Sequence, residues 1–277
     1  MKKFTIEDSR VQELKSKTRD LEQITLGSGG ESWEENTASF KESILQGDIS
    51  KFLQWPVTRK TMFVGECEKV VNEYNRLKES RRYVKAMEEN NIGEPEGLSF
   101  DANTSGNLVH NLYSLYFYET YFDVDVSRDV DVIFEFGGGY GGLCRGVFQL
   151  GFSKEYILYD IPPVVYIQDF YTKTIGLDSV NCIDSYPSLV RELSLHKEKQ
   201  NKMFIATWSL SEAPLSVRNS IIQLLQDFKY ILIVFSGTHD GVDNQEYFNS
   251  LKINGISFHI EDHPYCPHGK FFIGKKC

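Results

Sequence analysis

The sequence has few cysteines, and they form no pattern that would build a disulfide framework or a metal site. There are five, odd in number and scattered, and none belongs to a Cys-x-x-Cys pair. A set of disulfides and a structural zinc site are therefore not expected, and a reducing, cytoplasmic environment fits. No apolar run approaches the ~20 residues that cross a membrane. The N-terminus also lacks the apolar core of a secretory signal.

Positive charge is scarce as well. The chain has 30 basic and 39 acidic residues, which give a net charge of −9. Nucleic acid is disfavoured as the main partner, because binding of phosphates needs a clustered basic surface. The remaining composition, 41% hydrophobic and 25% charged, is that of an ordinary globular protein. A length of 277 residues suffices for one large domain, or for one domain with a helical attachment.

The first hundred residues are expected to form helices and loops. Residues 11–24 carry apolar side chains at helical spacing, and the glycines of residues 27–30 break that pattern. Residues 67–91 form a long charged segment that also has helical spacing. Residues 92–97 contain glycine and proline, which makes them the clearest linker in the sequence.

The pattern changes near residue 105, and we place a boundary there. Residues 1–104 are predicted to form a mostly helical region that acts as a lid over the substrate, and residues 105–277 the main domain. In the latter, an aromatic-rich helix over 107–122 precedes alternating strands and helices, which favours a parallel sheet covered by helices on both faces. The last two strands are close enough to form a hairpin, which would make one strand antiparallel. The expected strands cover residues 130–136, 156–159, 203–207, 230–235, 257–261 and 270–273.

A glycine cluster follows the first of these strands. The run Val-Ile-Phe-Glu135-Phe ends on Gly137-Gly-Gly-Tyr140-Gly141-Gly, and the next strand ends on Asp160. Glycine lets a backbone turn at positive φ and approach a ligand closely. An acidic residue at the end of the next parallel strand can accept hydrogen bonds from a ribose. Together these features predict a site for a nucleotide-type cofactor at the carboxyl edge of the sheet.

Three interpretations of the glycine cluster compete: a site for NAD, a site for S-adenosylmethionine, and a tight turn with only a structural role. Glu135 lies two residues before the first glycine, where its charge would repel a pyrophosphate but suit an amino-acid ammonium group. This favours S-adenosylmethionine, which has no phosphate. Asp160 would bind the ribose. Asp184, after a third strand, would lie near the adenine, or would be a turn or helix-capping residue.

The segment from Glu135 to Gly141 resembles motif I of class I S-adenosylmethionine-dependent methyltransferases, and Tyr156-Ile-Leu-Tyr-Asp160-Ile-Pro-Pro is similar to their acidic second-strand motif. Combined with Thr207-Trp-Ser-Leu-Ser-Glu212, these motifs resemble a bacterial sugar O-methyltransferase family. The resemblance implies a doubly wound α/β sheet of seven strands, the last antiparallel. It also implies S-adenosylmethionine as cofactor and S-adenosylhomocysteine as product. The expected cofactor residues are Glu135, Gly137, Gly138, Gly139, Tyr140, Gly141, Asp160, Ile161, Asp184, Ser185 and Trp208.

The methyl acceptor is expected beyond the same sheet edge. Transfer to a hydroxyl usually needs a base, and histidine suits this role because its pKa lies near neutral pH. The alternative for each histidine is a turn residue in contact with solvent. The candidate bases are His239 and His263, followed by Glu212 and His110.

The run His263-x-x-Cys266-x-His268 suggests a metal, but hard ions such as Mg²⁺ prefer oxygen ligands and zinc would need a fourth ligand from elsewhere. No metal is therefore expected. The aromatic residues of the 107–122 helix are expected to pack in the core, with one or two free to stack on a sugar or line the cofactor site.

The sequence therefore predicts an O-methyltransferase that acts on a hydroxyl of a sugar or a capsule precursor in the bacterial cytoplasm. Its partner would be a small molecule, and its oligomeric state, with a homodimer as one option, stays open. One alternative is methylation of a phosphorylated capsule modifier. Another is an NAD-dependent sugar oxidoreductase, although Tyr166-Ile-Gln-Asp-Phe170 lacks the lysine of a Tyr-x-x-x-Lys signature. A third is a non-catalytic protein of the same fold that pairs with an enzyme.

Overall fold

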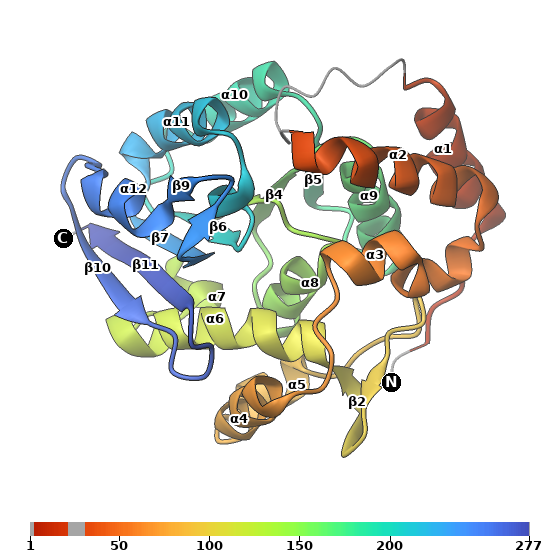
Figure 1. Ribbon diagram of the computed structural model, residues 1–277, viewed down its shortest axis with the longest axis horizontal. Coiled ribbons are helices and arrows are strands. Elements are labelled where there is room, and N and C mark those ends of the chain that lie inside the picture. Colours follow the sequence, from red (N-terminus) through yellow and green to blue (C-terminus); the bar gives the residue numbers. More distant parts are fainter. Residues whose placement is uncertain (1–2, 22–30, 277) are drawn as a thin grey trace.

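The centre of the fold is a seven-stranded sheet (Figure 1), seen in a computed structural model that describes residues 3–21 and 31–276. Its strand order is β10-β11-β7-β6-β3-β4-β5, and all neighbouring pairs are parallel except the two that involve β11. The predicted fold, with one antiparallel strand in an otherwise parallel sheet, is confirmed. The strands are β3 (Val132–Phe136), β4 (Glu155–Tyr159), β5 (Val180–Ile183), β6 (Lys202–Thr207), β7 (Tyr230–Ser236), β10 (Ile256–Asp262) and β11 (Gly269–Lys276).

Alternate residues of the central strands pack against helices on opposite faces. All five residues of β3 are buried, as expected for a parallel strand that is covered on both sides. Ile133 belongs to the apolar cluster beneath one face, whereas Phe134 belongs to the cluster on the other. The side chains of β3 therefore pack into a separate core on each face of the sheet, which is why the strand shows no alternation of polar and apolar residues.

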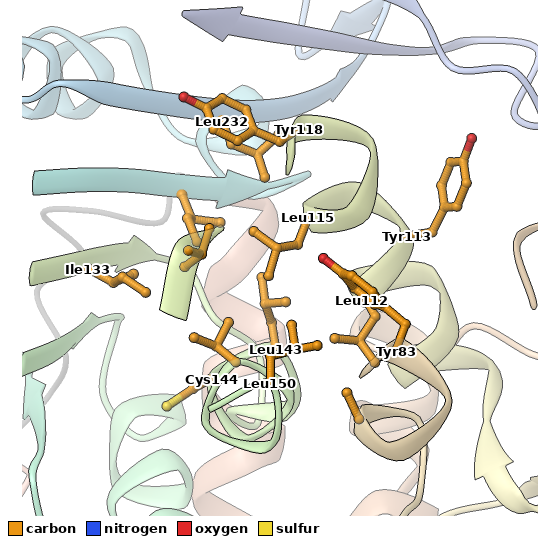
Figure 2. Close-up of a cluster of buried hydrophobic side chains, with 14 of the residues drawn as sticks. Tyr83, Leu112, Tyr113, Leu115, Tyr118, Ile133, Leu143, Cys144, Leu150 and Leu232 are labelled. Carbon is orange, nitrogen blue, oxygen red and sulfur yellow. The ribbon is translucent and has the colours of Figure 1, made fainter. Parts of the chain in front are cut away.

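One face of the sheet is covered by α6 (Gly106–Phe122) and α8 (Gly142–Gln149). Figure 2 shows Leu112 and Leu115 of α6 beside Leu143 of α8, all within this cluster. The hydroxyl of Ser105 accepts a hydrogen bond from the amide of Leu108 and so caps α6. Most aromatic residues of α6 are buried or partly buried as predicted, and Phe117 stacks on Phe271 of β11 with ring centres 4.1 Å apart, whereas Tyr121 is exposed.

The other face is covered by the helices that follow β5, β6 and β7. Phe248 is fully buried there and lies against Phe235 of β7 and Phe272 of β11. In Figure 1 these helices occupy the upper left, across the sheet from α6. They are α10 (Tyr186–Leu195), α11 (Leu215–Leu224) with the 3₁₀ turn η3 (Leu225–Asp227), and α12 (Asn244–Ser250).

The N-terminal helices pack against the rest of the chain in two groups. The first group lies at the right of Figure 1 beside α9 (Val164–Thr174), and Lys17 is ion-paired with Asp169 of that helix at 2.8 Å. The second group, α4 and α5, shares its core with α6. The first group is α1 (Asp8–Arg19), α2 (Glu31–Gln46), η1 (Ile49–Gln54) and α3 (Pro56–Thr61); the second is α4 (Glu68–Leu77) and α5 (Arg81–Ala86), followed by the hairpin β1 (Gly97–Leu98) and β2 (Asp101–Ser105).

Two expected helices differ from the structure. The segment 67–91 forms two helices, because the backbone at Ser80 is extended and starts a second helix there. The helix expected over 11–24 ends at Arg19; residues 22–24, and the break expected at 27–30, lie outside the described residues. Short elements that the sequence did not predict are α7 (Val126–Asp129), η2 (Leu210–Glu212), β8 (Thr238–His239) and β9 (Val242–Asp243).

Within the described part of the chain, none of the helices combines the length and the apolar character that crossing a membrane requires.

Candidate functional site

A cleft of about 350 Å³ opens at the carboxyl ends of β3, β4 and β6. Ligands of open α/β sheets bind at this edge. The glycine loop and the end of β4 form one wall, and the N-terminal region together with α6 forms much of the other. The first wall includes Gly137, Gly138, Gly139, Tyr140, Asp160 and Ile161. The second includes Trp33, Lys60, Lys69, Asn107, His110 and Asn111.

The glycine loop is held in a conformation that side chains would block. Gly137 has φ of +68°, and a Cβ atom on it would lie 2.3 Å from Cβ of Ser209. Ser209 is itself fixed, since its hydroxyl donates a hydrogen bond to the carbonyl of Phe136 at 2.5 Å. Gly141, with φ of +93°, begins α8 and does not line the cleft. The loop therefore presents bare backbone to whatever the cleft binds.

Asp160 ends β4, lines the cleft and is held on both carboxylate oxygens. Oδ1 accepts the amide N–H of Ile161 at 2.8 Å, and Oδ2 accepts the side-chain nitrogen of Gln168 at 2.7 Å. Burial raises the pKa of Asp160 to about 7, although both hydrogen bonds act in the opposite direction. Each oxygen keeps a lone pair for a further donor, which suits two neighbouring hydroxyls of a ribose.

Glu135 lies behind the glycine loop and is not among the residues that line the cleft. It is fully buried, and its carboxylate accepts a hydrogen bond from the hydroxyl of Tyr156 at 2.6 Å. Burial raises the pKa of Glu135 to about 7, with a smaller contribution from the charge of Asp160. A Cβ atom on Gly138 would lie 2.9 Å from this carboxyl group, so Glu135 supports the loop from below.

Asp184 and Ser185 lie at the end of β5, outside the lining of the cleft. Asp184 is exposed, and its carboxylate accepts a long hydrogen bond of 3.3 Å from Tyr166. Ser185 is the N-cap residue of α10, and its hydroxyl bonds to that of Ser188 at 2.9 Å. Ser185 therefore marks the start of α10, whereas the side chain of Asp184 contacts α9.

Trp208 follows β6 and forms part of the cleft in an unusual backbone conformation, with φ of +66°. Such a value is costly for a large side chain and points to a constraint at the site. The backbone N–H of Trp208 donates to the carbonyl of Val234 at 2.7 Å, and its ring stacks on His110 with centres 5.4 Å apart. The indole Nε1 is buried and has no hydrogen-bond acceptor among the described residues. This donor is therefore left unsatisfied within that part of the chain.

Behind Trp208 lies a buried group of Glu73, His110 and His263, which can each bring one ligand-type atom within 4.8 Å of the others. Nδ1 of His110 is 2.8 Å from Oε1 of Glu73, and Nε2 of His263 is 3.3 Å from the same oxygen. Of these three residues, His110 lines the cleft. Burial lowers the pKa of His263 to about 3, with smaller contributions from the neighbouring His110 and Lys69, so His263 is neutral at physiological pH.

The structure separates the four predicted bases. His110 and Glu212 line the cleft, whereas His239 and His263 do not. Burial raises the pKa of Glu212, against the effect of His239. Nε2 of His239 lies 3.6 Å from a carboxylate oxygen of Asp240, in the hairpin formed by β8 and β9.

Several residues of the site could not be recognised from the sequence. Gln168 on α9 and Glu73 on α4 are polar residues on the buried faces of their helices. In the sequence, only their inward-facing positions in the helical repeat could have singled them out. Lys69 lies over the ring of Trp208, with Nζ 6.0 Å from the ring centre, and makes no ion pair within the described residues. None of the three lies near a recognisable motif.

Comparisons with known proteins find matches of low similarity. The sequence matches no protein-family model and no curated protein. Similar solved structures include an O-methyltransferase family protein from Burkholderia thailandensis, with 12% identity and a TM-score of 0.41, where the match covers 61% of this chain and 58% of that one. A SAM-dependent methyltransferase from Aquifex aeolicus has 12% identity and a TM-score of 0.41, with 57% of this chain and 89% of that chain covered. An rRNA methylase from Streptococcus thermophilus has 13% identity and a TM-score of 0.43, with 59% and 96% covered.

Proposed function

We propose that the protein is an S-adenosylmethionine-dependent methyltransferase that transfers a methyl group to a hydroxyl of a small, sugar-like acceptor. The observation that carries the proposal is the meeting of the bare glycine loop with Asp160 on one wall of the cleft. Backbone that can approach a ligand lies there beside a carboxylate with lone pairs to spare for a ribose diol. Such a wall fits a nucleoside cofactor without needing a group that binds phosphate.

The cofactor side is proposed from the groups that line the cleft and keep hydrogen-bonding capacity. Asp160 would hold the ribose hydroxyls, and Gly137 to Gly139 would lie against the amino-acid end. The buried N–H of Trp208 is a further donor. Glu135 would act through the loop it supports, or through a water molecule, since Tyr156 holds its carboxylate away from the cleft lining. Bound S-adenosylmethionine supplies an electrophilic methyl group on its sulfonium; the protein has to orient the acceptor and accept its proton.

The acceptor side suits a polyhydroxylated molecule. Trp33 adds an aromatic side chain to the lining of the cleft, and Asn111 adds an amide side chain. Aromatic rings stack on the apolar face of sugars, and amides can both donate to and accept from hydroxyls. Lys60 and Lys69 add positive charge, which would also accept a phosphorylated or acidic sugar such as a capsule precursor.

The first experiment is calorimetric titration of the protein with S-adenosylhomocysteine, with NAD titrated in parallel. We expect micromolar affinity for the first, about −8 kcal/mol, and no binding of NAD. Asp160→Ala should weaken the affinity, whereas the matched control Asp178→Ala, in the exposed turn before β5, should leave it unchanged. Binding of NAD alone, or unchanged affinity in Asp160→Ala, would refute the proposal. Radiolabelled methyl donor and a panel of sugars, sugar phosphates and nucleotide sugars would then identify the acceptor.

A further inference from the structure

We infer that Glu73 and His263 hold His110 in one tautomer, with its Nε2 lone pair facing the cleft as the proton acceptor for methyl transfer. The catalytic part of this inference rests on the proposed function; the tautomers themselves do not. His110 is the catalytic residue in this scheme, and Glu73 and His263 are positioning residues.

The tautomers follow from a single backbone group. The amide N–H of Tyr265 donates to Nδ1 of His263 at 3.2 Å, so this nitrogen carries a lone pair. A neutral imidazole with a lone pair on Nδ1 carries its proton on Nε2. His263 therefore carries its proton on Nε2, which lies 3.3 Å from Oε1 of Glu73 but is not aligned to form a hydrogen bond with it. The partial positive charge of this nearby N–H favours Glu73 as a carboxylate.

The Glu73 carboxylate also determines the tautomer of His110. Oε1 of Glu73 lies 2.8 Å from Nδ1 of His110, and both side chains are buried. A carboxylate can only accept, so Nδ1 of His110 carries the proton and Nε2 carries the lone pair. Stacking on Trp208 limits rotation of the ring. Since His110 lines the cleft and its Nε2 has no partner within the described residues, the lone pair is available to an acceptor hydroxyl.

This arrangement fits a proton relay better than a metal centre, although the three residues are of types that bind metals. Histidines that bind a metal donate their other ring N–H to a neighbour and keep the ligating nitrogen unprotonated. Nδ1 of His263 instead accepts a hydrogen bond, which leaves the proton on the Nε2 atom that faces Glu73. Binding a cation there would require breaking the contact with the Tyr265 amide.

Methyl transfer to the acceptor hydroxyl needs only these side chains and the bound methyl donor. The acceptor oxygen forms a bond to the methyl carbon as the carbon–sulfur bond breaks, and that bond's electron pair stays on sulfur. The proton of the hydroxyl passes to Nε2 of His110. The resulting imidazolium is stabilised by the Glu73 carboxylate on its opposite nitrogen, and it returns the proton to solvent after the product leaves.

Nitrogen-15 NMR of histidine-labelled protein tests the tautomers directly, without cofactor or acceptor. His110 and His263 are assigned with His110→Gln and His263→Gln. At pH 8 we expect His110 to carry its proton on Nδ1 and His263 on Nε2. Glu73→Gln keeps an oxygen that can accept from Nδ1 and should preserve the His110 tautomer. Glu73→Leu removes the acceptor and should shift His110 toward the Nε2–H form. The matched control is Glu192→Gln, which removes a carboxylate 3.4 Å from His196 on the outer helix α10.

Diethylpyrocarbonate, which modifies unprotonated ring nitrogens, tests whether the lone pair faces the cleft. Mass spectrometry should find His110 modified in the wild type and severalfold more slowly in Glu73→Leu. The exposed His268 should react equally in both proteins, and His263 should be unreactive. If Glu73 served only packing, Glu73→Leu would change neither the His110 tautomer nor the ratio of the modification rates of His110 and His268. Thermal unfolding checks that the variants are folded.

Three results would overturn the inference: an Nε2–H His110 in the wild type, a His110 that does not react, or stoichiometric zinc or manganese in the purified protein that EDTA removes. Failure of the proposed function looks different. In that case S-adenosylhomocysteine does not bind, while the two tautomers are as expected.

Discussion

The side-chain nitrogen of Gln168 lies 2.7 Å from Oδ2 of Asp160, and it donates its second hydrogen to the carbonyl of Gly139 at 2.8 Å. Gln168 is fully buried on α9. One amide group therefore joins the end of β4 to the glycine loop, two segments that the proposed cofactor would bridge. The distance between them is set by a residue that need not touch the cofactor.

Gln168→Ala should weaken the binding of S-adenosylhomocysteine about tenfold, because a hydrogen bond to a charged group is worth ~1.5–3 kcal/mol. The loss arises from an Asp160 carboxylate that is no longer oriented. Calorimetric titration measures it. Gln223→Ala, an exposed change on α11, should bind as the wild type does. Equal affinities of the two variants would show that Asp160 needs no support from α9.

Gly137→Ala should abolish measurable binding of S-adenosylhomocysteine while the protein stays folded. An added methyl group meets Ser209 at 2.3 Å, and the φ of +68° disfavours any side chain. The loop would have to move away from its position at the cleft. The matched change Gly237→Ala introduces a methyl group that meets no atom within 4 Å, and its affinity should be unchanged. Wild-type affinity in Gly137→Ala would contradict the placement of the cofactor.

The affinity for S-adenosylhomocysteine should rise about tenfold between pH 6 and pH 8. The pKa of Asp160 is raised to about 7 in the free protein. Below that value the group is protonated, and binding a ribose diol as a carboxylate first requires loss of the proton. The charged fraction, and with it the apparent affinity, therefore grows as the pH rises through 7.

Titrations of variants across the same pH range identify the group responsible. Asp160→Asn should bind more weakly and without the pH dependence. Glu135 also has a pKa raised to about 7 but lies outside the cleft lining, so Glu135→Gln should keep the slope. A flat wild-type profile, or a slope that disappears only in Glu135→Gln, would rule out Asp160 as the titrating contact.

Arg218→Met should lower the free energy of unfolding by about 2–4 kcal/mol, the cost of leaving several buried acceptors unpaired. The buried guanidinium of Arg218 donates to the carbonyls of Ala213 and Ser211 and to Oδ1 of Asn244. Chemical denaturation measures the change. Arg191→Met on the exposed side of α10 should have little effect. Because Ala213 lines the cleft, the variant should also bind S-adenosylhomocysteine less tightly.

Much of the sheet could be predicted because local signals are strong there. The runs that became β3, β4, β6 and β7 are mostly apolar and short, and a glycine or polar residue follows each within two positions. The glycine loop was visible because positive φ demands glycine. Boundaries inside the helical region were less predictable, since the apolar spacing of 67–91 continues through residues 78–80, which separate α4 from α5.

The residues of the acceptor side were harder to predict from the sequence, because they come from elements far apart in the chain. The sequence ranked His239 and His263 ahead of Glu212 and His110 as candidates for the base, whereas the structure places only His110 and Glu212 of these four in the lining of the cleft. Their ranking depends on which side chains face the cleft and which nitrogen of each ring is already bonded. Those are properties of packing among α4, α6 and the final hairpin.

The sequence by itself determined the order of strands and helices and the position of the glycine loop. It also placed an acidic residue at the end of the second parallel strand. These are consequences of periodicity, of backbone freedom and of the rule that parallel strands end at a common edge. Only the tertiary structure decided that Gln168 orients Asp160, that Tyr156 bonds to Glu135 behind the loop, and that Glu73 bonds to His110 beside His263. Hydrogen bonds between residues distant in sequence leave no local pattern, because they depend on how whole helices and strands pack against one another.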